Sequence, residues 1–299
     1  MRTSSRRRPL LRLGTLALAL VLGSGAAFAA VALRELKAVT IAKQAEQSTR
    51  SVLLNADGAG PGTTTTTTTP PPPPKPKPIL PFNARLTSND IPVATGGVRS
   101  GGCSGALIAP QWIVSAGHCF HDVNDVRVSG APLYTTVVTV GRLNIADKGG
   151  QTAEVVDVRQ SPVNDLALAK LSVPVVDVVP LALPAAAPVL GQRLQFAGWG
   201  SLSASVITPT DHLKRGEFTV SVVAASVLEA QPVAPRTVEN SPCPQDSGAP
   251  FFVSEDNYTG VLVAVESTGP ECPQPGSEVI SRVDVVADWI RGQTGIAPR

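Results

Sequence analysis

Short runs of β-branched residues recur along the chain from about Phe82 onward, and Gly, Pro, Asn and Asp residues separate them. Many short strands with turn residues between them are typical of an all-β sandwich or barrel. We expect strands at residues 106–109, 112–116, 134–140, 154–158, 166–171, 193–199, 218–223, 261–265 and 279–283.

The segment 284–291 has a different periodicity. Asp284 can cap a helix, and Val285, Val286, Trp289 and Ile290 share one helical face. The sequence therefore predicts β-barrels that are closed by one C-terminal helix.

The N-terminus is typical of an exported protein. Residues 1–12 are basic and residues 13–33 carry no charge. We expect residues 1–29 to be a signal peptide that is cleaved after Ala29. The alternative is an uncleaved signal anchor, in which residues 13–33 tether the chain to a membrane. Both interpretations place the remainder outside the cytoplasm, either secreted or anchored.

Residues 30–81 are predicted to be a linker. They include seven threonines at 63–69 and five prolines at 70–74, a composition that cannot bury a core. The proline part should be extended, at ~3.1 Å per residue. We interpret it as a spacer, and an unselected disordered tail is the alternative. The 299-residue chain then has one folded domain, residues 82–299.

The charge of the predicted domain excludes one class of partner. Residues 82–299 contain 14 basic and 20 acidic residues, so the basic surface that nucleic acid requires is absent. We expect no nucleic-acid partner and a monomer.

Four cysteines fit an oxidising compartment, where an even number usually indicates disulfides. Cys103 and Cys119 flank two predicted neighbouring strands and are the first expected pair, which leaves Cys243 with Cys272. Zinc is the alternative, but no short paired Cys/His spacing supports it. We expect no metal and no cofactor.

Three short segments contain residues with the chemistry of nucleophilic catalysis. His118 ends an apolar strand, Asp165 leads another, and Ser247 lies in a tight turn next to a cysteine and a proline. Each has an ordinary structural explanation when it is taken alone. Together they supply a nucleophile, a base to remove its proton and an acid to orient that base.

At this point the chain resembles the trypsin/chymotrypsin family of serine proteases over about residues 86–292. Residues 103–119 look like the family's first disulfide and histidine segment, and the Asp165 segment looks like its aspartate strand. Residues 198–200, Gly-Trp-Gly, are similar to the motif that opens its second barrel. We expect a secreted, bacterial-type member of this family.

The resemblance implies an all-β, chymotrypsin-like fold of two six-stranded antiparallel barrels, with the active site in the cleft between them. It assigns His118 as general base, Asp165 as its orienting acid and Ser247 as nucleophile. It also implies that the N–H groups of Gln245 and Ser247 form the oxyanion hole. Cys243–Cys272 would brace the specificity pocket.

Two departures from the family pattern concern activation and the oxyanion hole. The family usually has glycine where this chain has Gln245, and glycine reaches backbone angles that cost other residues about 1 kcal/mol or more. Family zymogens expose a new N-terminus, typically Ile-Val-Gly-Gly, whose ammonium pairs with the aspartate before the nucleophile. Asp246 is present, but no such tetrapeptide precedes the domain. Either Asp246 has another partner or activation works differently.

The third departure concerns specificity. Trypsin-like preference for Arg or Lys needs a carboxylate six residues before the nucleophile, where this chain has Ser241. The hypothesis is therefore an uncharged or apolar preference. Glu266, in a strand that would line the pocket, could restore a basic preference.

The sequence thus predicts an exported serine endopeptidase that hydrolyses protein or peptide substrates through an acyl-enzyme. The alternative is a catalytically impaired, protease-like binding module. An esterase is disfavoured because the Gly-x-Ser-x-Gly elbow is absent around Ser247. His121 and His212 are expected on the surface.

Overall fold

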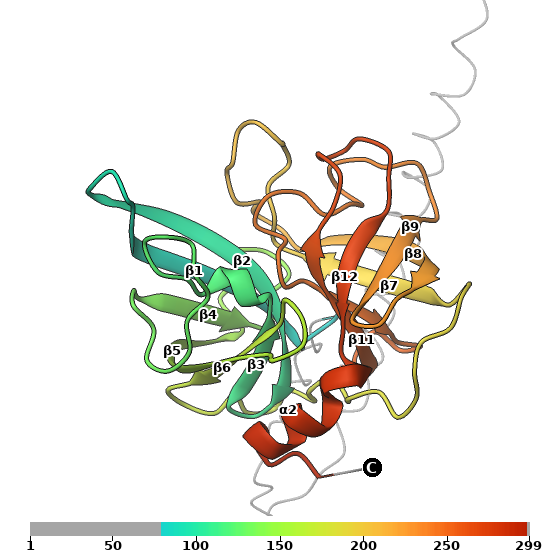
Figure 1. Cartoon of the computed structure of the whole chain (residues 1–299), viewed down its shortest axis with the longest axis horizontal. Helices are drawn as coiled ribbons and strands as arrows, with labels where there is room; N and C mark the ends of the chain where they lie inside the picture. The colour runs from blue at the N-terminus through green and yellow to red at the C-terminus, as the bar shows by residue number, and fades with distance from the viewer. Residues whose placement is uncertain (1–78, 298–299) are drawn as a thin grey trace, which may run out of the picture. The chain divides into compact units, whose positions relative to one another are not determined.

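The computed structural model of the protein describes residues 79–297. This part of the chain folds into two closed, six-stranded barrels that lie side by side in Figure 1, and their strands pair antiparallel. The first barrel runs in cyan to green colours and the second in yellow to red. The predicted fold is therefore confirmed.

The first barrel has the strand order β1-β2-β3-β6-β5-β4. Hydrogen bonding between β1 and β4 closes it. Its strands are β1 (Asn83–Pro92), β2 (Val98–Ala109), β3 (Trp112–Ser115), β4 (Thr136–Val140), β5 (Gln151–Gln160) and β6 (Ala167–Leu171).

The second barrel has the corresponding order β7-β8-β9-β12-β11-β10, with β7 and β10 closing it. Its strands are β7 (Arg193–Gly198), β8 (Lys214–Val223), β9 (Val227–Pro232), β10 (Pro250–Val253), β11 (Val261–Thr268) and β12 (Glu278–Arg282).

Three strands have no counterpart among the predicted runs. β1 contains Asn89 and Asp90, and β9 contains Glu229, all residue types that are depleted in strands. β10 has only four residues and begins with proline. These segments become strands because each pairs with two neighbours in a closed barrel, so barrel closure overrides weak local propensity.

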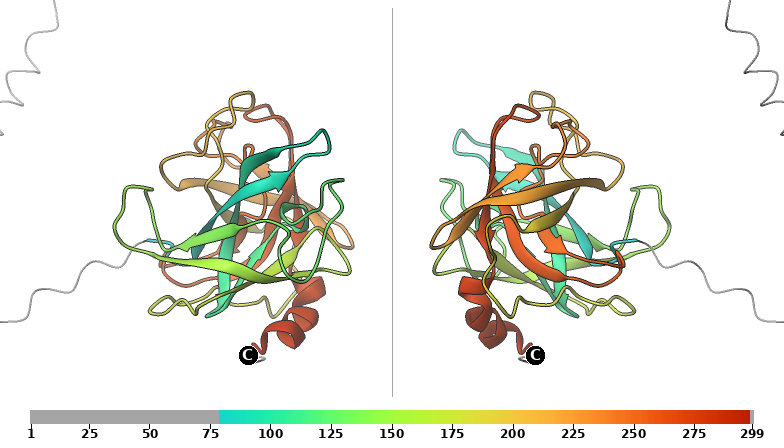
Figure 2. Two further views of the ribbon diagram at one scale, coloured as in Figure 1. Left: turned by 90° about the vertical axis from the view of Figure 1, so that its left-hand side faces the viewer. Right: turned by 90° about the vertical axis from the view of Figure 1, so that its right-hand side faces the viewer.

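The C-terminal helix is present but begins later than expected. A 3₁₀ turn covers Asp284–Val286, and the helix α2 covers Ala287–Thr294 below the barrels in Figures 1 and 2. The prediction that Asp284 caps the helix is wrong, because its carboxylate instead accepts hydrogen bonds from Arg282. Ile290 is completely buried against the barrels.

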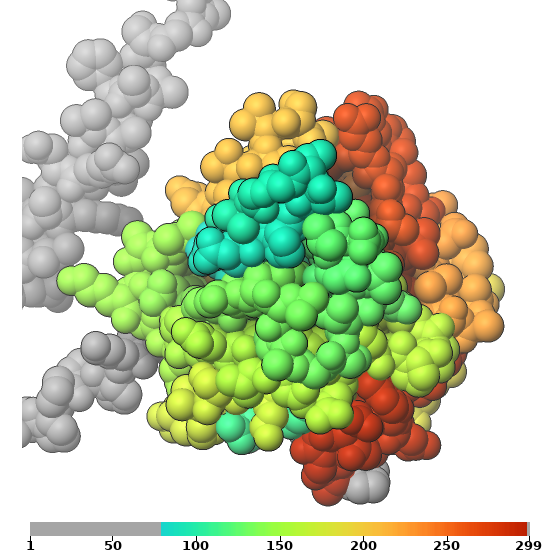
Figure 3. All heavy atoms as spheres, turned by 60° about the vertical axis from the view of Figure 1, so that its left-hand side comes forward, coloured from blue at the N-terminus to red at the C-terminus, as the bar shows by residue number. Residues whose placement is uncertain are grey.

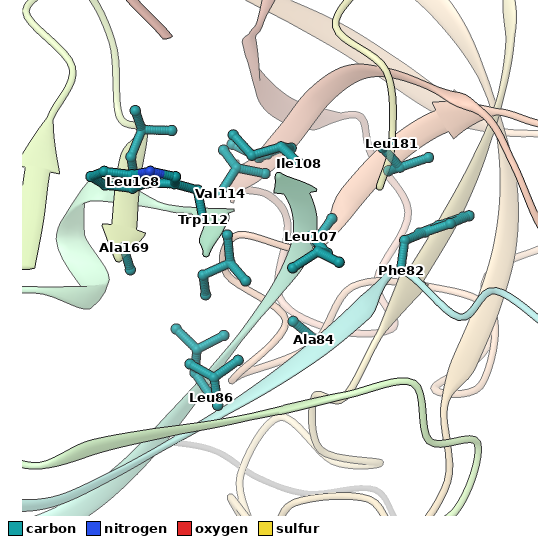
Figure 4. Close-up of a cluster of buried hydrophobic side chains, with 14 of the residues drawn as sticks. Phe82, Ala84, Leu86, Leu107, Ile108, Trp112, Val114, Leu168, Ala169 and Leu181 are labelled. Carbon is teal, nitrogen blue, oxygen red and sulfur yellow. The ribbon is translucent and has the colours of Figure 1, made fainter. Parts of the chain in front are cut away.

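Each barrel contains its own group of buried side chains. In the first, large aliphatic residues from β1, β2, β3 and β6 pack together, and Figure 4 labels Leu86, Leu107 and Leu168 among them. In the second, the rings of Phe196, Phe218 and Phe251 meet at centroid distances between 5.1 and 6.1 Å. Each barrel therefore has a packed interior behind the surface that contacts the other barrel.

Buried hydrogen bonds join the two barrels. The Trp199 indole N–H donates to Asn83 Oδ1 at 2.8 Å, and the Trp199 backbone N–H donates to Ser104 Oγ at 2.8 Å. The part-buried Asn164 amide also donates to the Ser226 carbonyl at 3.0 Å. These bonds fix one barrel against the other at the place where their loops meet.

The N-terminal predictions concern a different part of the chain. The signal or anchor at 1–29, the tether at 13–33 and the linker up to residue 78 lie outside the described residues. Among residues 79–297, no helix is long and apolar enough to cross a membrane.

Candidate active site

His118 and Asp165 are hydrogen-bonded to each other twice. His118 lies in a short 3₁₀ turn, Gly117–Cys119, which follows β3. Its ring Nδ1 is 2.7 Å from Asp165 Oδ2, and its backbone N–H donates to Asp165 Oδ1 at 2.9 Å. Asp165 immediately precedes β6, the strand that pairs with β3. Strand pairing in the first barrel thus places the imidazole beside the carboxylate.

Two residues of the second barrel hold Asp165 in place. The Ser267 hydroxyl donates to Asp165 Oδ2 at 2.8 Å, and the Ser281 hydroxyl donates to its carbonyl at 3.0 Å. Burial raises the pKa of Asp165, but the hydrogen bonds and charge of His118 and the bond from Ser267 outweigh it, so the pKa is lowered overall. The carboxylate is therefore ionised at neutral pH and fixes the His118 tautomer.

Ser247 lies in a turn that is packed against the first barrel. Its carbonyl accepts the Ser104 N–H at 2.9 Å. The next residue, Gly248, has φ +82°, and a Cβ there would lie 2.2 Å from Ser115 Oγ, so only glycine fits. Ser247 and His118 line one cavity of about 360 Å³.

Within the described residues, no hydrogen bond joins the Ser247 hydroxyl to the His118 ring. Nucleophile–base hydrogen bonds are often long without substrate and tighten in the complex. Figure 3 shows the green surface of the first barrel adjoining the red surface of the second. The three sequence-predicted residues thus come from both barrels, and two of them are in direct contact.

The backbone N–H groups of Gln245 and Ser247 donate no hydrogen bond within the described residues. Gln245 has φ +78°, the left-handed conformation that glycine adopts readily. The Pro244 carbonyl accepts the Ser201 N–H at 2.8 Å, and in the trans peptide the Gln245 N–H points the opposite way. The hydrogen bond from Ser201 therefore fixes the direction of the Gln245 N–H.

Asp246 has an internal partner that the sequence did not predict. Its carboxylate is ion-paired with Lys214 at 2.5 Å, and both side chains are completely buried. Lys214 begins β8 and has no distinguishing sequence signal, because its role depends on the register of β7 and β8. It answers the open question about the partner of Asp246.

Both expected disulfides are present. Cys103 pairs with Cys119, and Cys243 pairs with Cys272, which leaves no free cysteine. The first bridge lies beside His118 and the second beside the turn that precedes Ser247. Among residues 79–297, no group of His, Cys, Asp or Glu side chains could hold a metal ion.

A second cavity of about 240 Å³ adjoins Ser247 and is lined by Glu266 and Glu278. Ser241 is buried, and its hydroxyl donates to Asn240 Oδ1 at 2.9 Å, so it is not among the lining residues. Glu278 is ion-paired with Arg236, and the exposed fractions of the two side chains are 1% and 3%. Sequence reasoning missed Glu278 and Arg236, because nothing in the local sequence marks either of them.

The two other histidines differ in exposure. His121 is buried, contrary to expectation, and its ring Nδ1 lies 2.7 Å from the Asp122 carbonyl. His212 is partly exposed between Asp211 and Glu239, and the hydrogen bonds that its ring donates to these carboxylates raise its pKa.

A known protein family matches both barrels of the described structure. The profile of the family described as Trypsin matches residues 83–290. The match starts at the first residue of β1 and ends within α2, so it covers both barrels.

Individual relatives also have sequences similar to this chain. Brachyurin of Leptuca pugilator is 28% identical over 216 residues, which are 66% of this chain and 89% of brachyurin. Anionic trypsin of Bos taurus is 28% identical over 218 residues, 63% of this chain and 78% of the relative. The Suppressor of tumorigenicity 14 protein homolog of Bos taurus is 29% identical over 223 residues, 65% of this chain but only 25% of that longer protein. With the same two-barrel fold and a match across both barrels, this chain belongs to the trypsin family.

Proposed function

We propose that the protein is an exported serine endopeptidase that acts through His118, Asp165 and Ser247. The observation that carries the proposal is the His118–Asp165 hydrogen bond at the cavity that Ser247 lines. A base with an orienting carboxylate beside a hydroxyl is the arrangement that activates serine.

The proposed reaction has two acyl-transfer steps. Ser247 Oγ attacks the peptide carbonyl carbon, and its proton passes to His118 Nε2. The carbonyl oxygen becomes an oxyanion, which the amides of Gln245 and Ser247 stabilise. The C–N bond then breaks, the leaving amine takes the proton from His118, and an acyl-enzyme remains. Water, deprotonated by His118, attacks this ester, the C–O bond to Ser247 breaks, and His118 returns the proton to Ser247 Oγ as the acid leaves.

Export and chain organisation belong to the same proposal. Two disulfides are typical of a domain that folds outside the cytosol, and the signal at 1–29 or a tether through 13–33 would deliver it there. The domain would comprise residues 82–299 behind the linker 30–81 and act as a monomer. The relatives named above come from animals, and membership of a bacterial type remains our proposal.

The direct test is the reaction of the purified full chain with a fluorophosphonate probe, followed by peptide mapping and a casein digestion. The expected result is one labelled site, Ser247, and casein cleavage that the probe blocks. A folded chain without labelling or cleavage would instead favour the protease-like binding module.

Replacing Gln245 with glycine tests whether the backbone alone supplies the oxyanion donor. We expect kcat of Gln245→Gly to stay within about twofold of wild type, because the donor is a main-chain amide. The free energy of unfolding should rise by up to ~1 kcal/mol, since left-handed φ is unfavourable for glutamine and the flexible unfolded glycine offsets part of the gain. A large loss of kcat would contradict this role of Gln245; denaturant unfolding and steady-state kinetics measure both quantities.

For the specificity pocket we propose a preference for uncharged side chains at neutral pH. Glu278 is ion-paired with Arg236, and the neighbouring carboxyl group of Glu266 is buried. Burial and the charges of Glu278 and Asp246 raise the pKa of Glu266 well above its ordinary value. At neutral pH the two buried glutamates therefore supply no free negative charge to bind Arg or Lys.

This arrangement predicts specificity that depends on pH. Burial raises the pKa of Glu278 to about 7, so the buried pair of Glu266 and Glu278 gains negative charge as the pH rises, against the single cation of Arg236. The kcat/KM ratio for Lys over Leu before the cleaved bond should increase roughly 10-fold to 100-fold between pH 6 and pH 9, the strength of a hydrogen bond to a charged group. Exposed Glu271 also lines this cavity.

Matched peptide substrates that differ only in the residue before the cleaved bond measure this ratio. Glu266→Gln should flatten its pH dependence. Strong Arg or Lys selectivity that does not vary with pH would refute the proposed preference.

A further inference from the structure

The buried ion pair of Lys214 and Asp246 connects the second barrel to the turn that carries Ser247. Lys214 is the first residue of β8, and its side chain reaches inward from the barrel wall. Its ammonium lies 2.5 Å from Asp246 Oδ2, and neither side chain is exposed to solvent. A buried ion pair is tolerated only where further polar groups satisfy both partners.

Every polar neighbour of the Lys214 ammonium is an acceptor. Besides Asp246, it donates to the carbonyls of Ser201 at 3.2 Å, Val238 at 3.3 Å and Ser241 at 3.0 Å. An ammonium has three donors and no acceptor, so this shell of oxygens suits the charged form of lysine alone. The site is built around a fixed positive charge.

The Asp246 carboxylate is held equally firmly. It accepts the Gly200 N–H at 2.6 Å and the Cys243 N–H at 2.9 Å. A Cβ at Gly198 would lie 2.0 Å from one carboxylate oxygen, so the Gly-Trp-Gly motif leaves room for the aspartate itself. Burial raises the pKa of Asp246, and the Lys214 charge and these two amides oppose that rise.

The ion pair reaches the candidate oxyanion hole through Ser201. Lys214 binds the Ser201 carbonyl, and the Ser201 N–H binds the Pro244 carbonyl, which sets the direction of the Gln245 N–H. Asp246 lies between Gln245 and Ser247, the two residues whose amides would bind the oxyanion. Lys214 therefore fixes this turn at two points.

Lys214 supplies the cation beside Asp246 for which the resemblance implies a new N-terminal ammonium. In this chain β1 continues from Asn83 in hydrogen bonding with both β2 and β4, and Leu80 ahead of it is completely buried. The turn before Ser247 already has its cation without a free chain end.

We propose that Lys214 is a positioning residue that replaces the N-terminal ammonium, so that the peptidase domain reaches its active arrangement without cleavage of the chain. The proposal rests on the peptidase function proposed above. It resolves the absence of an activation tetrapeptide before the domain.

The first test is fluorophosphonate labelling of the full chain, made in an oxidising cell-free system and shown by intact mass to be uncleaved. We expect near-stoichiometric labelling, with no more than a twofold rise in rate after an endopeptidase trims the N-terminal segment. Labelling only after trimming would overturn the role of Lys214 while leaving the peptidase function intact. Labelling in neither state would refute the peptidase function, and the inference would fall with it.

The second test separates positioning from simple stabilisation. Lys214→Met should lower kcat and kcat/KM together by ~10²–10³-fold with KM nearly unchanged, because an oxyanion donor acts only in the transition state. Arg282→Met, which breaks a largely buried ion pair next to the second barrel, with Asp284 at 2.6 Å, is the control. It should lower Tm and leave kcat unchanged. Wild-type kcat in folded Lys214→Met would overturn the proposal; if that variant does not fold, labelling of the intact chain decides.

Discussion

Ser247→Ala should abolish fluorophosphonate labelling and lower kcat by about 10⁶-fold, the largest effect expected for any single substitution in this chain. The nucleophilic oxygen disappears, and no covalent acyl-enzyme can form. The remaining activity would come only from the oxyanion donors and the binding of substrate. Active-site labelling and hydrolysis of an activated peptide ester measure the two consequences separately.

The structure offers a good control for this substitution. Ser203 lies in an exposed loop, and its hydroxyl accepts hydrogen bonds only from neighbouring residues of that loop. Ser203→Ala should therefore label and hydrolyse like wild type. Continued labelling of Ser247→Ala at the wild-type rate would show that another residue is the nucleophile.

Asp165→Asn should lower kcat by ~10⁴-fold while the fold stays intact. The amide keeps the size of the carboxylate, but it cannot stabilise a protonated imidazole. It can also donate to His118 Nδ1, which leaves the ring in the wrong tautomer. Steady-state kinetics above pH 7 measure the loss.

The same substitution should also change the acid stability of the protein. The folded-state pKa of Asp165 is lowered, so its contribution to stability is present above the unfolded pKa and is lost as the pH falls through the folded value. The Tm difference between wild type and Asp165→Asn should therefore shrink in acid. Asp157→Asn breaks an exposed ion pair with Arg159 and is the matched control, with unchanged kcat. Equal kcat values for the two variants would contradict the role of Asp165.

Most strands of the described fold were predictable because their residues carry a local signal. Alternation of β-branched residues between turn residues marks β6, β8 and β11, and the barrels contain them where expected. β1 carries no such signal, because Asn89, Asp90 and Pro92 are unfavourable in strands. It is a strand because it pairs with β2 and β4. The C-terminal helix begins later than expected because the Asp284 carboxylate accepts hydrogen bonds from Arg282 instead of capping the helix.

The candidate site divides in the same way. His118, Asp165 and Ser247 each have an ordinary structural explanation when taken alone, but their three short segments together carry the resemblance to the family. Glu278 and Lys214 are single charged residues at the starts of ordinary strands. Their importance depends on what the closed second barrel places opposite them.

The amino-acid sequence by itself determined the all-β class, the two disulfides and the segments that contain a base, an acid and a nucleophile, because each depends on short-range patterns and compartment. Only the tertiary structure decided that Lys214 is the counter-ion of Asp246 and that Arg236 is the counter-ion of Glu278. The physical reason is that the stability of a buried charge depends on its ion-pair partner. The register of the barrel strands brings together partners that lie 32 to 42 positions apart in the chain.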